Sequence, residues 1–255
     1  MRMKKIDKFI NLILPLITLA CILLLWSVGA IVVGSEYILP SVKTTLKEFV
    51  CLFKNKNFYT ALSFSLLRSA VAFFVSFVPS AILAYLASKS KTADKLILPF
   101  ISIVRALPTL AIILLVLFWT NNDRQVTPIV VTMLVVMPTV YTNLRTALDG
   151  IDKTTIDAGK VDGAGKKQLF FYIELPQIAP PLFNVIGSGL SLNLKLMVAA
   201  EVISATAKSL GAMLNNSSYN AEIITMLALV VVILIIGLLI EFVFNKLSQK
   251  VGEWR

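Results

Sequence analysis

The sequence predicts an all-α membrane protein with six transmembrane helices. Of its 255 residues, 57% are hydrophobic and 15% are charged, whereas soluble domains have about 45–50% apolar and about 25% charged residues. Six apolar stretches without charges are long enough to cross a hydrocarbon core of about 30 Å. Because lipid satisfies no backbone hydrogen bonds and these stretches lack the alternation of barrel strands, each is predicted to be helical.

The first stretch runs from Leu12 to Val33 and follows a cluster of cations. Its 22 residues exceed the roughly 7–15 apolar residues of a signal peptide, so an uncleaved first span is favoured over a leader. The preceding cations are Arg2, Lys4, Lys5 and Lys8. After this span, apolar residues recur at near-helical spacing within 35–60, opposite Lys43 and Lys47. This pattern predicts a helix lying at the membrane interface.

The remaining stretches predict spans two to six. They cover residues 69–88, 106–122, 125–144, 175–194 and 223–240. Six spans place both termini on one side of the membrane. With the N-terminus inside, inside segments hold 15 of the 24 Lys and Arg residues and outside segments hold 6. The positive-inside rule therefore predicts that both termini are cytoplasmic, in a single transmembrane domain covering residues 1–255.

Charge and cysteine content exclude several other classes of protein. The formal net charge of +10 comes from short clusters of Lys and Arg between apolar stretches, which is unlike a nucleic-acid module with interleaved aromatic residues. Cys21 and Cys51 form neither a disulfide framework nor a zinc site. The chain has no His, so histidine acid–base chemistry and histidine metal ligation are excluded.

The longest inside segment, about 143–181, carries most of the polar pattern. Apolar residues alternate with charged ones over 151–173, so two short amphipathic helices are predicted, with a break at Gly163 and Gly165. The prolines that follow are predicted to end the second helix and turn the chain into the bilayer; they are Pro176, Pro180 and Pro181. The segment is either a solvated loop against the membrane or a docking element that a partner orders.

The residues of this segment resemble a known family. Asp157-Ala158-Gly159, three residues, Gly163, nine residues, Ile173, one residue and Leu175-Pro176 resemble the Glu-Ala-Ala-x3-Gly-x9-Ile-x-Leu-Pro loop of permease subunits in bacterial ATP-driven (ABC) importers. Three further motifs resemble the nitrate, sulfonate and taurine branch: Arg105-Ala106-Leu107-Pro108-Thr109, Ala199-Ala200-Glu201 and Ser209-Leu210-Gly211-Ala212-Met213-Leu214. The resemblance covers roughly residues 60–245.

The resemblance implies a type I ABC importer-like permease in the bacterial cytoplasmic (inner) membrane. Implied partners are a second copy of the permease, an ATPase subunit that binds ATP and Mg²⁺, and an extracytoplasmic solute-binding protein. The implied solute is a small anion such as a sulfonate, taurine or nitrate, or a vitamin precursor. In the family this loop forms the coupling helix that docks on the ATPase; the residues implied to form the docking loop here are Asp157, Ala158, Gly159, Gly163, Ala164, Ile173, Leu175 and Pro176. Asp157 replaces the usual Glu, and Gly159 replaces the usual second Ala.

No catalytic or cofactor site of its own is predicted for the chain. Residues 159–167 superficially suggest a phosphate-binding loop, but five residues separate the glycines instead of four, and Lys167 replaces the required Ser or Thr. Neither a nucleophile with its base nor a metal cluster assembles from the sequence. The chain is therefore predicted not to be an enzyme, and ATP is expected on another subunit.

Arg105, Lys195 and Glu201 are the charges hardest to place against lipid, where an ion costs about 2.5–3.5 kcal/mol. Arg105 and Lys195 either snorkel or form interhelical ion pairs, or they line a translocation path. Glu201 is either a gate in that path or a packing contact. Lys195 and Glu201 lie about 120° apart on a helix, so they are not expected to pair directly. The position of Arg68 at the edge of span two favours a structural role for this residue over a role in transport. A stand-alone secondary transporter is the alternative function, although it would need ion-coupling residues and often repeated halves.

Overall fold

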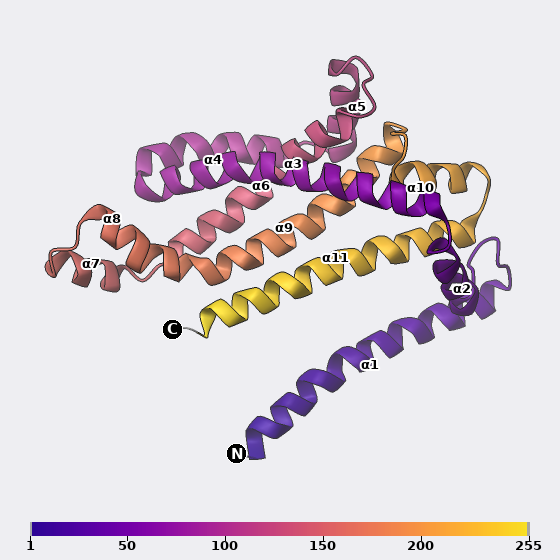
Figure 1. Cartoon of the computed structure of the whole chain (residues 1–255), viewed down its shortest axis with the longest axis horizontal. Helices are drawn as coiled ribbons and strands as arrows, with labels where there is room; N and C mark the ends of the chain where they lie inside the picture. Colours follow the sequence, from indigo (N-terminus) through magenta and orange to yellow (C-terminus); the bar gives the residue numbers. More distant parts are fainter. Residues whose placement is uncertain (1, 254–255) are drawn as a thin grey trace. The chain divides into compact units, whose positions relative to one another are not determined.

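The computed structural model describes the backbone of residues 2–253 and the side chains of residues 13–253. The side chains of Arg2, Lys4, Lys5 and Lys8, which contribute to the predicted topology, lie outside this description. Within the described part all regular secondary structure is helical (Figure 1). The prediction of an all-α chain is confirmed.

The helices follow one another with short connections, except between α6 and α9. In chain order they are α1 (Arg2–Val33), α2 (Val42–Leu52), α3 (Lys56–Lys89), α4 (Lys91–Ala106), α5 (Thr109–Trp119), α6 (Thr127–Asp149), α7 (Lys153–Val161), α8 (Lys166–Gln168), the π-helical turn η1 (Leu169–Glu174), α9 (Leu175–Ile203), α10 (Leu210–Tyr219) and α11 (Ile223–Gly252). Residues 150–174 between α6 and α9 are called the connecting loop below.

Five helical segments of the described part are long and apolar enough to cross a membrane. They are Ile13–Val33, Lys56–Lys89, Thr127–Asp149, Lys166–Ile203 and Ile223–Gly252. Each contains most or all of one predicted span. The helix α2 lies within the region predicted to form an interfacial helix, and Ser41 caps it by accepting the Thr44 N–H at 3.2 Å.

The predicted third span, 106–122, is wrong as a single straight helix. The helices α4 and α5 meet there at an angle of 94°. Pro108 has no N–H and disfavours a helical conformation for the residue before it, and Leu107 is accordingly extended, with φ −71° and ψ 133°. With 11 residues, α5 is about 16 Å long and too short to cross alone. The bent pair α4 and α5 counts as the sixth crossing only when taken together.

The prolines after Ile173 do not end the second loop helix, so that prediction is also wrong. Residues Lys166–Ile203 form one helical segment, in which Pro176 lies in the first turn of α9. The turn before it is π-helical, and the Leu175 N–H bonds to the Phe170 carbonyl five residues earlier. In a π-helical turn an N–H bonds to the carbonyl five residues earlier, whereas a proline ring conflicts with the carbonyl four residues earlier in an ordinary helix. The connecting loop is therefore continuous with α9 from Lys166 onward.

The chain divides into two compact groups of residues by its internal contacts. One contains Met1–Phe58 with Leu214–Val232, and the other contains Tyr59–Met213 with Ile233–Arg255. The single domain predicted for residues 1–255 stays a prediction. In the first group, the Trp26 side chain on α1 donates a hydrogen bond to the Pro40 carbonyl at 3.0 Å, which fixes the turn between α1 and α2.

In the second group, the core forms between α3, α4, α5, α6 and α9, and α6 packs along α9 (Figure 1). Small residues allow the helices of this group to approach closely at Gly187 and Gly189. A Cβ at Gly189 would lie 2.7 Å from the Phe73 ring, and one at Gly187 would lie 2.5 Å from the Phe244 Cβ. Ser76 and Ser80 on α3 donate hydrogen bonds to the Met133 and Met137 carbonyls of α6. Such contacts between small and polar residues hold membrane helices together.

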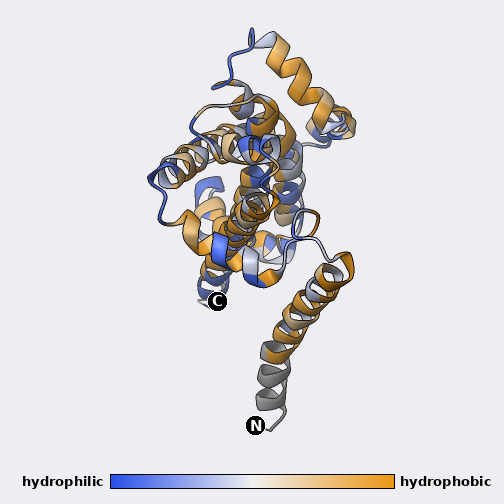
Figure 2. Cartoon of the chain, turned by 90° about the vertical axis from the view of Figure 1, so that its right-hand side faces the viewer, coloured by the Kyte–Doolittle hydropathy of each residue, from blue (hydrophilic) through white to orange (hydrophobic). Residues whose placement is uncertain are grey.

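Hydrophobic residues cover most of the helical surface, whereas hydrophilic residues gather mainly in the connections (Figure 2). Large apolar side chains remain exposed along the spanning helices, for example Leu25 on α1, Phe74 on α3 and Leu238 on α11. An exposed apolar surface of this extent is expected of a protein whose solvent is lipid.

Candidate functional site

The connecting loop begins with a firmly capped helix. The Asp152 carboxylate accepts hydrogen bonds from the Thr154 N–H at 2.9 Å and from the hydroxyls of Thr154 and Thr155 at 2.7 and 2.5 Å. These donors, led by the Thr155 hydroxyl, lower the pKa of Asp152 to about 2. The Asp152 N–H donates to the Gln177 side chain at 2.8 Å. The start of α7 is thereby attached to α9.

The same helix ends in a Schellman motif at Gly163. Gly163 has a φ of +83°, its N–H bonds to the Lys160 carbonyl, and the Ala164 N–H bonds to the Gly159 carbonyl. These are the two hydrogen bonds of that motif, which favours glycine in the left-handed position. The predicted break at Gly163 is confirmed. Gly165 has an ordinary φ of −70° and is the N-cap residue of α8, with its N–H bonded to the Gln168 side chain.

Gly159 allows α7 to pack directly on the π-helical turn. A Cβ at this position would lie 2.7 Å from the Ile173 Cδ1 and 2.9 Å from the Leu169 Cδ2. The structure thus brings Gly159 and Ile173 together, two residues of the predicted motif that are 14 positions apart. The departure from alanine at position 159 accompanies a close packing of the two halves of the loop.

The opposite face of α7 is exposed. The Asp157 side chain is 70% exposed and pairs with Lys160 at 2.7 Å, while Ala158 is exposed beside it. Three large apolar side chains of the loop also have high exposed fractions: 87% for Val161, 58% for Phe171 and 79% for Tyr172. Leu175 and Pro176 follow at the exposed start of α9. In Figure 1, α7 and α8 lie beyond the ends of α6 and α9, which leaves this surface accessible to a partner.

The end of α3 contacts the π-helical turn through two pairs of side chains. The Tyr85 and Phe170 rings meet edge to face, with centroids 6.0 Å apart. One turn further along α3, the Lys89 Nζ donates to the Glu174 Oε1 at 2.6 Å. The Lys89 ammonium also lies 5.4 Å from the centre of the Tyr85 ring. The connecting loop is therefore attached to α3 as well as to α9.

Glu201 lies in a buried polar cluster and has no exposed surface. Its carboxylate pairs with Arg68 at 3.1 Å and accepts hydrogen bonds from the Ser65 hydroxyl at 2.7 Å and the Gly211 N–H at 3.3 Å. Arg68 also donates to the Gln125 side chain and the Ala207 carbonyl. The cluster joins α3, α9 and α10. The described conformation encloses the Glu201 side chain. A place for Glu201 along a translocation path stays a prediction.

The sequence interpretation missed the pairing of Arg68 with Glu201. It placed Arg68 at the outer edge of span two and Glu201 within span five, and it assigned neither residue a partner. A buried acid without a partner is costly, so the need of Glu201 for a nearby cation was the signal that could have pointed to the pair. The expectation that Lys195 does not pair with Glu201 is confirmed, because Glu201 pairs with Arg68.

Arg105 and Lys195 remain exposed on their helices. Among the side chains of residues 13–253, neither of the two forms an ion pair within this chain. Lys195 faces α11, where a Cβ at Gly237 would lie 3.4 Å from its Cε. A charge left unpaired within a membrane helix needs water or a neighbouring subunit. Both positions are thus free to contact a solute path or a second chain.

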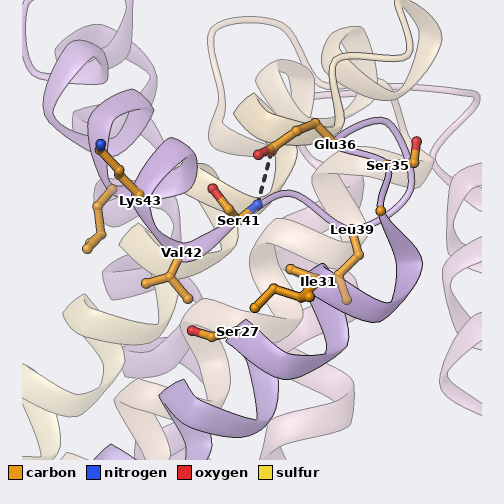
Figure 3. A pocket seen from close by; sticks show the side chains of 11 residues that line it. Ser27, Ile31, Ser35, Glu36, Leu39, Ser41, Val42 and Lys43 are labelled. Atoms are coloured by element: carbon orange, nitrogen blue, oxygen red, sulfur yellow. Dashed lines mark hydrogen bonds between the residues drawn. The ribbon is translucent and has the colours of Figure 1, made fainter.

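The turn between α1 and α2 borders a cavity of about 680 Å³ (Figure 3). Glu36 folds back over it, and its carboxylate accepts the Ser41 N–H at 3.0 Å and the Thr44 hydroxyl at 3.1 Å. The Ser41 N–H in particular lowers the pKa of Glu36. These contacts hold the turn together. No group of three or more Cys, Asp or Glu side chains that could hold a metal ion occurs in the described part of the chain.

Comparison with known proteins agrees with this geometry. The family model described as "Binding-protein-dependent transport system inner membrane component" matches residues 76–253. The chain is 25% identical over 243 residues to the "Taurine transport system permease protein TauC" of Escherichia coli (strain K12), covering 93% of this chain and 88% of that protein. The family match includes the entire connecting loop.

Two solved transporter structures share the fold. The inward-facing MetNI methionine ABC transporter superposes with a TM-score of 0.66 at 19% identity, over 75% of this chain and 94% of that chain. A bacterial ABC transporter involved in the import of alginate gives a TM-score of 0.66 at 17% identity, over 98% and 99% of the two chains. The fold is that of a type I ABC importer permease, and the chain belongs to the family of binding-protein-dependent transport system inner membrane components.

Proposed function

We propose that this permease forms the translocation path of an ATP-driven importer for a small sulfonate such as taurine. In this proposal ATP and Mg²⁺ bind to a separate ATPase subunit, which docks on the connecting loop at the cytoplasmic side. A second copy of the permease completes the path, an extracytoplasmic solute-binding protein delivers the solute, and both termini are cytoplasmic. The observation that carries the proposal is the capped but largely exposed helix α7.

The loop has the properties of a docking surface. Helix α7 has only nine residues, and isolated helices of this length are marginal in water. Here it is capped at both ends and packed on one side at Gly159. Its other side exposes Asp157, Ala158 and Val161. A preformed helix with an exposed, partly apolar face loses little conformational entropy when a partner covers it.

Helical continuity supports a coupling role. The segment Lys166–Ile203 is one continuous helix, and α7 packs on its π-helical turn at Gly159. A displacement of α7 would therefore also move the base of α9. Differential binding of the ATPase to two positions of the loop would then shift the permease between two conformations.

The unpaired cations support a path between two copies of the chain. Lys195 and Arg105 are exposed on membrane-associated helices, where an unpaired charge facing lipid is costly. A second copy covering these faces would place both cations beside a water-filled path. The positive charges would favour an anionic group such as a sulfonate. TauC, named as a taurine transport permease, supports this solute class.

The docking proposal is tested by placing a charge on the exposed face of α7. Val161→Asp changes an 87% exposed side chain, so it leaves the fold of the permease intact. We expect the candidate ATPase subunit to co-purify at least tenfold less with this variant than with the natural chain. The matched control is Tyr219→Asp, at a 92% exposed residue at the end of α10, which is expected to leave co-purification unchanged. Equal recovery from both variants would contradict docking on α7.

Transport is tested in liposomes with radiolabelled taurine. Uptake is expected only when permease, ATPase, solute-binding protein and ATP are all present. Uptake by the permease alone, driven by an ion gradient, would instead support a secondary transporter. Nitrate competing as effectively as aliphatic sulfonates would move the solute class away from sulfonates.

A further inference from the structure

The end of α3 and the π-helical turn contact each other with matching spacing. Tyr85 and Lys89 are four residues apart on α3, and their partners Phe170 and Glu174 are also four residues apart. A spacing of four places two side chains on one face of a helix. The two contacts therefore join one face of α3 to one face of the turn, by an aromatic contact and an ion pair.

The ion pair is buried on its acidic side. The Glu174 side chain is 7% exposed, whereas that of Lys89 is 47% exposed. One carboxylate oxygen receives the Lys89 ammonium at 2.6 Å, and the other, Oε2, is buried without a hydrogen-bond partner among the described residues. A buried carboxylate depends strongly on its remaining partner. Lys89 is thus the group that stabilises the charge of Glu174.

Lys89 and Glu174 both line two cavities beside the connecting loop. One cavity, of about 540 Å³, also borders Asp157 and Lys160 of α7. The other, of about 360 Å³, also borders Arg145 of α6. Both cavities also border Lys153 and Ile156 of α7, so α7 has unfilled space beside the ion pair. The π-helical turn itself is a rare element that is frequent at functional sites.

We propose that Lys89 and Glu174 are positioning residues that transmit movement of the connecting loop to α3. The inference rests on the proposed coupling function of the loop. According to this proposal, movement of the connecting loop displaces two helices. It displaces α9 through the continuous helical segment, and α3 through the Lys89–Glu174 ion pair and the Tyr85–Phe170 contact. Breaking the ion pair uncouples α3 but leaves docking of the ATPase and movement of α9 in place.

The test follows α3 and α9 separately in the assembled complex. Cys21 and Cys51, both exposed, are first replaced by Ser. A nitroxide label is then placed at Leu67 on α3, which is 61% exposed, or at the exposed Ser188 on α9. We expect both labels to change mobility when the natural complex is trapped with ATP and vanadate. In Lys89→Glu only the Ser188 label is expected to respond, and taurine uptake per ATP hydrolysed is expected to fall at least tenfold.

Exchanging the charges of Lys89 and Glu174 distinguishes a loss of transmitted movement from a general loss of folding. The double variant Lys89→Glu with Glu174→Lys restores opposite charges, and it is expected to recover the Leu67 response and at least a third of the lost uptake. The matched control is Lys91→Glu, the same charge change two residues along the chain at an exposed lysine. It is expected to behave like the natural protein.

A conservative variant covers the case in which Lys89→Glu does not fold. Arginine offers two parallel donors to a carboxylate, so Lys89→Arg reaches the free Oε2 of Glu174 as well. It is expected to retain uptake and the Leu67 response, whereas Lys89→Met, which keeps the aliphatic stem, loses both. A Leu67 response in Lys89→Met equal to that of the natural chain would overturn the inference. If neither label responds in the natural complex, or the ATPase does not bind, the proposed function itself fails.

Discussion

The Glu201 carboxylate on α9 lies 3.1 Å from the Arg68 guanidinium on α3, and Glu201 has no exposed surface. The two residues are 133 positions apart in the chain, yet each satisfies the charge of the other. The Ser65 hydroxyl contributes a further bond to the carboxylate and receives the Leu210 N–H at 2.9 Å. Three helices are consequently held at one polar cluster.

Removing Arg68 is expected to destabilise the permease strongly. Arg68→Ala leaves a buried carboxylate without its ion-pair partner, which typically costs about 3–5 kcal/mol. The double variant Arg68→Ala with Glu201→Ala is expected to lose less than the sum of the two single variants. Thermal unfolding in detergent measures both losses. The control Arg124→Ala changes an exposed residue and is expected to have little effect; an equal loss there would contradict the importance of the pair.

Gly211→Ala is expected to disturb the same cluster by steric conflict. Its Cβ would lie 2.4 Å from the Glu201 Cβ and 2.6 Å from the Val202 nitrogen. Because a backbone atom cannot rotate away, the loss of stability should reach about 3 kcal/mol, the upper part of the range for overpacking. Gly165→Ala, whose nearest neighbour would be 3.7 Å away, is the control. Similar unfolding temperatures for the two variants would rule out this close helix crossing.

The effect of Gly159→Ala on stability is expected to depend on the size of the side chain at position 173. The new Cβ meets only the ends of two side chains, Ile173 and Leu169, while alanine gains up to about 1 kcal/mol in helix propensity. Shortening Ile173 to Val removes the Cδ1 that lies closest. The double variant is therefore expected to be more stable than the two single effects predict, by about 0.5 kcal/mol or more. Strict additivity in thermal unfolding would argue against the packing of α7 on the turn.

The cap at Asp152 should make α7 dependent on pH in the acid range. Its pKa falls from an ordinary value of 3.8 to about 2 in the folded protein. The stabilising contribution is thus fully present above about 4 and is lost as the pH falls through about 2. Hydrogen–deuterium exchange of residues 153–161, corrected for intrinsic rates, measures this loss. Asp152→Asn retains a capping side chain that does not titrate, so its protection should stay level over the same interval.

The sequence was sufficient to predict five of the spanning helices, the all-α class and the break at Gly163. Apolar length and composition determine whether a segment is stable in lipid, and both are local properties. The left-handed conformation at Gly163 is likewise a local property of a helix end. The spacing of the motif from Asp157 to Pro176 predicted the family for the same reason, because that pattern lies within 20 consecutive residues.

Only the tertiary structure decided which distant residues meet. The ion pairs of Arg68 with Glu201 and of Lys89 with Glu174 join residues 133 and 85 positions apart, so no local pattern reports them. The π-helical turn that carries the chain past Pro176 and the 94° bend at Pro108 show the same dependence. A proline restricts its own backbone and that of its neighbour, but packing around it decides whether the helix continues or turns.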